Sequence, residues 1–318
     1  MDKPVRMTPV KSKGALRRAH VMLRRWEIGL RMREAHGDPD IWLLESKAPA
    51  ARSPWSDTRT HPGAATQAGP GSAVEVVESE ARLRVYAVHD YFVALRTTTG
   101  TRSAYSLYVM CRATIEACAF ATWVFDPAAR PEERLLRGLR LAAEPLRRRL
   151  KPLEAMESDA TGFWGEDFRA DRASAKNRAL VYQHNIERAI QSIHAEPQKS
   201  DGHSSREPSR VPSASQRVRE MLCDEMDLPQ GLDAYHRMSG VAHSEALAII
   251  GTWNWDTKRP SIDYFSFLEF LHLALCAVAF MLERRAACWG ENCKLKKLHK
   301  VIGRVERIIE REPGVQLD

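Results

Sequence analysis

Residues 73 to 97, AVEVVESEARLRVYAVHDYFVALRT, repeat an apolar side chain at intervals of three or four positions. The side chains in this repeat are Val74, Val77, Ala81, Val85, Val88, Phe92 and Leu95. Such spacing returns to one side of an α-helix and forms a narrow apolar seam. The stretch therefore predicts a long helix that packs against an antiparallel neighbouring helix.

Most of the remaining chain shows the same helical period. Residues 14 to 36 form an apolar stripe surrounded by arginines, and residues 102 to 125 are apolar on nearly every side. Pro131 suits the first turn of another helix, which Pro145 and Pro152 should kink or end. Further helices are expected over residues 170 to 194, 213 to 226, 233 to 250 and 261 to 289. Because no stretch alternates with the period of a strand, the predicted fold class is an all-α helical bundle.

Two stretches break the helical pattern, and they divide the chain. Residues 48 to 72 and residues 196 to 215 are rich in Pro, Gly, Ser and Ala. Stretches of this composition neither sustain a helix nor bury an apolar face. We therefore expect an N-terminal basic helical segment at 1–47, a flexible linker at 48–72, and an all-α bundle at 73–312 that a mobile loop at 196–215 interrupts.

The charge of the chain favours an anionic partner. The net charge is +7, from 48 Lys and Arg against 41 Asp and Glu. The arginine clusters are Arg17, Arg18, Arg24, Arg25, Arg31 and Arg33, followed by Arg147, Arg148 and Arg149. Clusters of this kind attract phosphate backbones, so RNA or a nucleotide is a candidate partner, with solvated surface arginines as the alternative. The N-terminal helix is expected to form the main basic surface.

Several features concern the cellular compartment. The first residues, MDKPVRMTPVKSKG, lack the apolar core and cleavage site of a signal peptide. The six cysteines show no spacing typical of a disulfide framework or of a complete zinc site. Residues 261 to 289 are as long as a membrane span, but Glu269 and His272 favour a helix buried in a bundle. These features predict a cytoplasmic protein with no membrane segment, no metal and no cofactor.

The stretch AYHRMSGVAHSEAL, residues 234 to 247, holds the residue types that chemistry uses. Arg237 and His243 are six positions apart, so a helix turns them about 120° away from a shared face. His236 and His243 share a face more closely, with Ser239 between them. An arginine can hold a phosphate and an imidazole can move a proton, so these residues are the candidate site.

The same stretch resembles the motif of the HEPN superfamily of helical bundles. That motif is an arginine followed, after a few residues, by a histidine on a late helix of an all-α chain. This chain carries it as Tyr235, Arg237, Ser239 and His243. The earlier stretch CRATIEACAFATW is similar to the first core helix of that group, with Arg112 and Glu116 one turn apart. The resemblance covers residues 73 to 290.

The resemblance implies a chemistry for the candidate site. HEPN ribonucleases cut RNA without a metal, at the interface of a homodimer. Arg237 would hold the phosphate and His243 would move the proton. The supporting residues would be Tyr235, His236, Ser239, Arg112 and Glu116.

A binding function is favoured over this chemistry. Active members of the family usually carry a polar residue after the arginine, and this chain has Met238. The predicted function is a HEPN-like module of a bacterial stress or defence system that binds a nucleotide, a nucleic acid or a protein partner. The metal-independent endoribonuclease is the alternative. Structural roles also stay open, with Arg112 and Glu116 as an ion pair and His243 as a packed polar residue. A zinc hydrolase on His236 and His243 lacks a carboxylate at a fixed spacing.

Overall fold

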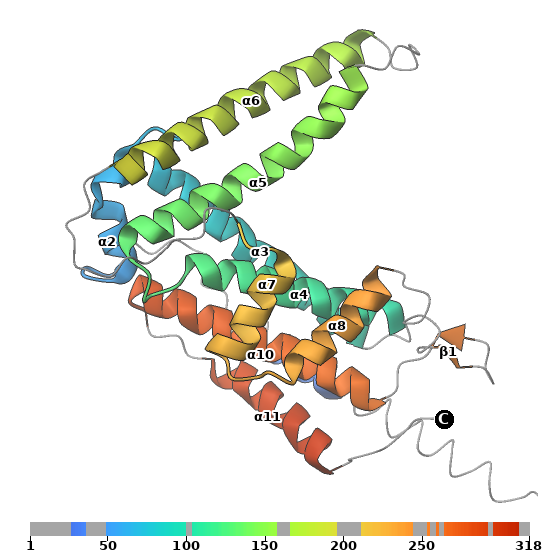
Figure 1. Ribbon diagram of the computed structural model, residues 1–318. Helices are drawn as coiled ribbons and strands as arrows, with labels where there is room; N and C mark the ends of the chain where they lie inside the picture. Colours follow the sequence, from blue (N-terminus) through green and yellow to red (C-terminus); the bar gives the residue numbers. More distant parts are fainter. Residues whose placement is uncertain are drawn as a thin grey trace, which may run out of the picture.

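The fold is all-α, as the sequence predicts (Figure 1). A computed structural model describes residues 27–35, 49–99, 104–157, 166–195, 211–243, 253–254, 259–260, 264–291 and 295–311. The longer helices are α3 (Ala73–Thr99), α4 (Ala104–Val124), α5 (Pro131–Glu157), α6 (Glu166–Ala195), α8 (Gly231–Ala242), α10 (Tyr264–Trp289) and α11 (Lys296–Arg311). The short helix α7 (Ala214–Arg219) continues into the π-helical segment η2 (Glu220–Glu225).

The centre of the bundle is the pair α4 and α10, which run in the same direction. Tyr108 packs on Phe270 near one end, with ring centroids 5.0 Å apart, and Phe125 packs on Trp289 at the other end, at 5.6 Å. Both helices are long and apolar enough to cross a membrane, and 67% of each apolar window is buried. That burial is compatible with the core of a soluble bundle, which the sequence favoured for residues 261 to 289.

The helix expected from residues 73 to 97 is confirmed as α3. Only residues 100–103 join it to α4, so α4 returns along it as an antiparallel neighbour. Arg84 of α3 lies over the ring of Phe120 of α4, 5.6 Å from the ring centroid. The seam positions buried in the core are Val77, Ala81, Val85, Val88, Phe92 and Leu95, with Val74 partly buried at its margin.

α5 and α6 form a hairpin that extends away from the rest of the bundle (Figure 1). Pro131 begins α5, as expected, but the helix continues through Pro145 and Pro152 to Glu157. Of the two predicted effects of these prolines, a kink or an end of the helix, the second is wrong. An interior proline removes a hydrogen bond and costs about 3 kcal/mol. α5 packs against α6 along the hairpin.

The segment expected to be a flexible linker at 48–72 is largely ordered. α2 (Pro54–Thr60) and the 3-10 helix η1 (Pro62–Ala65) each begin with a proline. Trp55 of α2 is completely buried and stacks on Trp289, with ring centroids 4.4 Å apart. The linker prediction was wrong because a proline in the first turn favours a helix and one buried tryptophan anchors the segment to the bundle.

Two other predicted segments are described only in part. The predicted loop at 196–215 lies mostly outside the described residues, but its end is ordered, because the side chain of Ser213 caps α7 by accepting from the Gln216 amide. Most of the basic segment at 1–47 also lies outside the described residues. Its residues 27–35 are helical. The side chains that this helix buries are Ile28, Met32 and Ala35.

One element departs from the expectation of helices alone. β1 (Trp253–Asn254) pairs antiparallel with β2 (Arg259–Pro260). These two-residue strands lie in the stretch GTWNWDTKRP, for which the sequence shows no strand period. So short a pair leaves the all-α class unchanged.

Candidate functional site

Arg237 joins α8 to the central helix α10. α8 begins at Gly231, so Asp233 lies in its first turn. Nε of Arg237 donates to Asp233 at 3.1 Å, and Nη2 donates to Glu269 at 2.5 Å. The guanidinium also lies over Phe270, 5.1 Å from the ring centroid. Burial lowers the pKa of Arg237, and the two carboxylates more than reverse that effect, so the pKa lies above its usual value.

The histidines of the motif occupy exposed positions. His243 ends α8, and its backbone amide donates to the carbonyl of Ser239 at 2.9 Å. His236 is also exposed, and its ring centroid lies 5.7 Å from that of Tyr235. Among the described residues no hydrogen bond or ion pair joins Arg237 to His243. The structure is a single chain, so a shared site at a homodimer interface stays a prediction.

Three of the expected supporting residues form one network between α8 and α4. The Tyr235 hydroxyl donates to Oε1 of Glu116 at 2.8 Å, across 119 positions of sequence. Nε of Arg112 donates to the same oxygen at 2.8 Å, so the ion pair expected from the four-residue spacing is present. Burial, and then the hydrogen bond to Glu116, raise the pKa of Tyr235 above its usual value. The phenol therefore keeps its proton and fixes the Glu116 carboxylate.

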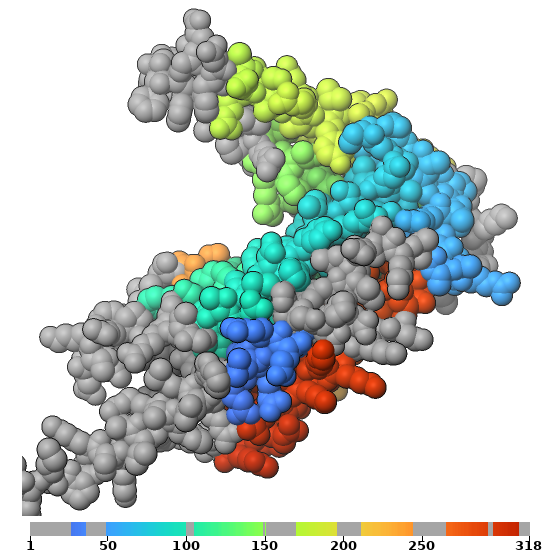
Figure 2. All heavy atoms as spheres, turned by 180° about the vertical axis from the view of Figure 1, so that it is seen from behind, coloured from blue at the N-terminus to red at the C-terminus, as the bar shows by residue number. Residues whose placement is uncertain are grey.

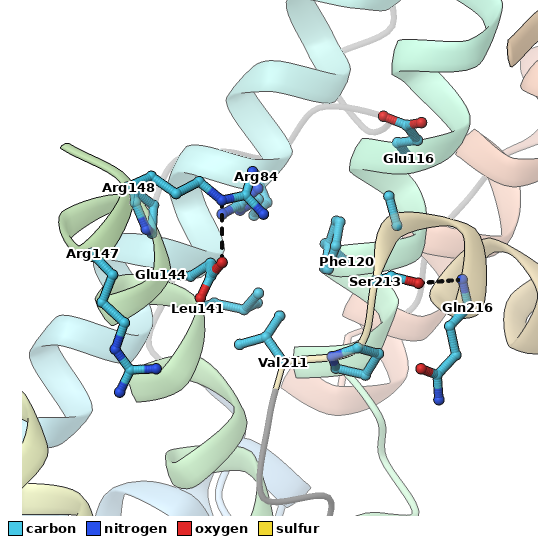
Figure 3. Close-up of a pocket in the computed structure, with 13 residues that line it drawn as sticks. Arg84, Glu116, Phe120, Leu141, Glu144, Arg147, Arg148, Val211, Ser213 and Gln216 are labelled. Atoms are coloured by element: carbon cyan, nitrogen blue, oxygen red, sulfur yellow. Dashed lines mark hydrogen bonds and ion pairs between the residues drawn. The ribbon is translucent and has the colours of Figure 1, made fainter. Parts of the chain in front are cut away.

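A cleft of about 1150 Å³ lies beside this network, and Glu116 is part of its wall. Figure 2 shows the molecule hollowed between α5, in green, and α3, in cyan. The wall comes from α3, α4, α5 and the segment that leads into α7 (Figure 3). The charged lining residues are Arg84, Glu116, Glu144, Arg147 and Arg148, and the apolar ones include Phe120, Leu141 and Val211.

Each arginine that lines the cleft has a carboxylate partner. The pairs are Arg84 with Glu80 at 2.5 Å, Arg147 with Glu187 at 3.1 Å, and Arg148 with Glu144 at 3.1 Å. The Arg84 pair is the most buried of the three, and Arg84 also lies over Phe120. The other two pairs are largely exposed. Arg84 is therefore a fixed part of the wall, while Arg147 and Arg148 can change partners.

Sequence reasoning did not find this cleft. The sequence marks Arg147 and Arg148 only as part of a basic cluster, and Glu116 only through its spacing from Arg112 and through the resemblance. Arg84 and Phe120 were not singled out at all. No local pattern marks them, because these residues meet only after α3, α4 and α5 pack together.

A second cluster, between α10 and α11, is unsuited to nucleophilic chemistry. Nε2 of His272 lies 3.4 Å from Sγ of Cys276 and 3.0 Å from Oε1 of Glu306. Burial, and then the Glu306 carboxylate, raise the pKa of Cys276 to about 12. The thiol therefore stays protonated near neutral pH and is a poor nucleophile. Within the described residues no group of three His, Cys, Asp or Glu side chains could hold a metal ion.

The HEPN-like resemblance rests on the motif residues of α8 and α4. Comparison with known proteins adds no relative. The chain matches no family model, no curated protein and no solved structure.

Proposed function

We propose that the protein is a non-catalytic, HEPN-like binding module whose cleft takes a phosphate-bearing planar ligand, either a free nucleotide or an unpaired nucleotide of a single strand. The observation that carries the proposal is the presence of Arg147 and Arg148 in the same cleft as Phe120 (Figure 3). Arginine binds phosphate oxygens through paired N–H donors. An aromatic ring offers a base a surface for stacking.

The energetics favour an exchange of partners at the two outer arginines. Exposed ion pairs such as Arg147 with Glu187 and Arg148 with Glu144 stabilise a fold by about 0.2–1 kcal/mol. A phosphate offers paired acceptor oxygens to each guanidinium, so it can replace these carboxylates at little cost to the fold. The carboxylates also keep the empty cleft close to neutral, which disfavours weak binding of unrelated anions.

Glu116 gives the cleft a means of choosing among bases. Its carboxylate is held by Tyr235 and Arg112, and it lines the cleft near Phe120. A fixed carboxylate accepts a hydrogen bond from the exocyclic amino group of a base. A base that lacks such a group would leave the carboxylate without that bond. We therefore expect amino-bearing bases to bind more tightly than uracil.

The proposed setting combines the structure with the resemblance. The described cysteines are Cys111, Cys118, Cys223, Cys276 and Cys288, and all are free thiols. Free thiols are typical of a reducing compartment, which supports the cytoplasm. A homodimer and a role in bacterial stress or defence are proposed from the HEPN-like resemblance.

The test measures binding of fluorescent ATP and of a labelled short single-stranded RNA by fluorescence anisotropy. The variant Arg147→Gln/Arg148→Gln should bind both probes about tenfold more weakly, a loss of about 1.4 kcal/mol. The matched control is Arg178→Gln/Arg188→Gln, which removes the same charge from exposed positions of α6 that do not line the cleft. Unlabelled ATP should displace the RNA if both probes share the cleft.

Two results would overturn the proposal. One is a parent protein that binds neither probe, and the other is an equal loss of affinity in the control variant. A further measurement separates binding from cleavage. RNA incubated with the protein in EDTA should stay intact. Cleavage that leaves a 2′,3′-cyclic phosphate and disappears in His243→Ala and in Arg237→Ala would replace the binding module with the ribonuclease.

A further inference from the structure

α11 is an amphipathic helix on the outside of the bundle, beside the helical residues 27–35 (Figure 2). Its apolar side packs against α10. The buried residues on that side are Leu298, Val301, Ile302, Val305 and Ile308. Nη2 of Arg304 donates to Glu27 at 3.2 Å and fixes α11 against residues 27–35. The apolar side is therefore occupied by the fold, and the opposite side faces solvent.

The solvent side of α11 carries a row of cations. Lys296, Lys300, Arg307 and Arg311 are all exposed. None of the four forms an ion pair within the part of the chain that the structure describes. On a helix these positions lie within roughly 60° of one another and extend over roughly 22 Å. We call these four residues the α11 basic stripe.

Gly303 lies on the same side of α11 as the stripe, and the packing of the protein does not require a glycine there. A Cβ atom at Gly303 would meet Arg307 at 3.7 Å and Glu306 at 3.8 Å, which are ordinary contacts with flexible side chains. Glycine inside a helix lowers its stability relative to alanine. The missing side chain lets another backbone approach the helix closely. A phosphate chain laid along the stripe would use that space.

We propose that the α11 basic stripe docks the phosphate backbone of a nucleic-acid duplex without reading its bases. A rigid row of four cations complements a rigid row of phosphates, and the stripe has no aromatic ring on which an unpaired base could stack. A membrane surface fits less well, because a helix that binds a bilayer inserts its apolar side and the apolar side of α11 is buried. This surface is separate from the cleft, so the inference does not rest on the proposed function.

The test measures binding of a short DNA duplex by fluorescence anisotropy across a range of salt concentrations. Each phosphate contact contributes about −0.9 to the slope of log affinity against log salt, so four contacts contribute about −3.6. The variant Lys296→Gln/Lys300→Gln/Arg307→Gln/Arg311→Gln should lose about that slope. The parent should weaken by at least roughly a hundredfold between about 50 and 200 mM salt, and the variant much less.

The control is Arg82→Gln/Arg178→Gln/Arg188→Gln/Arg219→Gln, which removes the same charge from exposed positions on other helices. It should keep the slope of the parent. Duplexes of unrelated sequence, and an RNA duplex, should bind about equally. The proposal is overturned by a parent that binds no duplex, by an equal loss of slope in the control, or by a preference for phosphatidylserine vesicles or an acidic peptide.

Discussion

The cations of the cleft and the cations of α11 differ in what surrounds them. Each arginine that lines the cleft has a carboxylate within ion-pair distance. The four cations of the α11 basic stripe have none among the described residues. A paired cation binds a new anion only by exchange, whereas an unpaired cation binds by simple attraction. The cleft should therefore be selective and weakly dependent on salt, and α11 unselective and strongly dependent on salt.

A third cation, Arg134, is more buried than those of the cleft or of α11, and its partners are neutral oxygens. Arg134 has 1% of its surface exposed. Its Nε donates to Oγ1 of Thr58 at 2.7 Å, and its Nη2 donates to the carbonyl of Pro54 at 2.5 Å. Nη1 donates to the carbonyls of Asp126 and Ala129. This guanidinium therefore holds α2 on the start of α5.

The largest expected effect comes from this buried arginine. Arg134→Met removes every one of these bonds and leaves buried acceptors unsatisfied, so the free energy of unfolding should fall by about 3–5 kcal/mol. Arg148→Met is the control, since its pair with Glu144 is exposed and should cost less than about 1 kcal/mol. Urea denaturation of both variants measures the difference. Equal losses in the free energy of unfolding would show that burial does not determine how much an arginine stabilises this fold.

The helix α3 could be predicted from the sequence because its evidence is local. The seam of residues 73 to 97 is a matter of spacing along one segment, and it is buried as expected. The order of residues 54–65 could not be predicted in this way. It depends on Trp55 meeting Trp289 and on Pro54 meeting Arg134, which are contacts between distant segments. The composition of this segment, rich in Pro, Gly and Ala, gives no sign of these two contacts.

The candidate site shows the same division. Tyr235, Glu116 and Arg112 could be singled out from the sequence, and the structure joins them at one carboxylate oxygen. The spacing of Arg112 and Glu116 on one helix was enough to predict their pairing, whereas Tyr235 enters only through tertiary packing. The sequence did not predict the hydrogen bond from Arg237 to Glu269, because nothing in the local sequence indicates that α10 lies opposite α8.

A smaller effect is expected from Tyr235, a neutral donor to the Glu116 carboxylate of the cleft wall. Tyr235→Phe removes the hydroxyl that donates to Glu116 and should lower the free energy of unfolding by about 1–2 kcal/mol. Tyr86→Phe is the control, because Tyr86 is exposed and should change stability by less than about 0.5 kcal/mol. Urea denaturation measures both. If Glu116 positions a base, Tyr235→Phe should also reduce the preference for amino-bearing bases over uracil. An unchanged preference would confine Tyr235 to a structural role.

The smallest expected effect is a gain of stability on α11. Gly303→Ala should raise the free energy of unfolding by about 0.5–1 kcal/mol, because alanine loses less backbone entropy in a helix and its Cβ would meet only ordinary contacts. Gly138→Ala on α5 is the opposite case, since its Cβ would overlap the side chain of Val77 and overpacking costs about 1–3 kcal/mol. Thermal unfolding should show a gain of stability in Gly303→Ala and a loss of stability in Gly138→Ala. A loss of stability in Gly303→Ala would mean that this glycine serves the fold, and α11 would no longer contrast with the cleft as a surface left open for a partner.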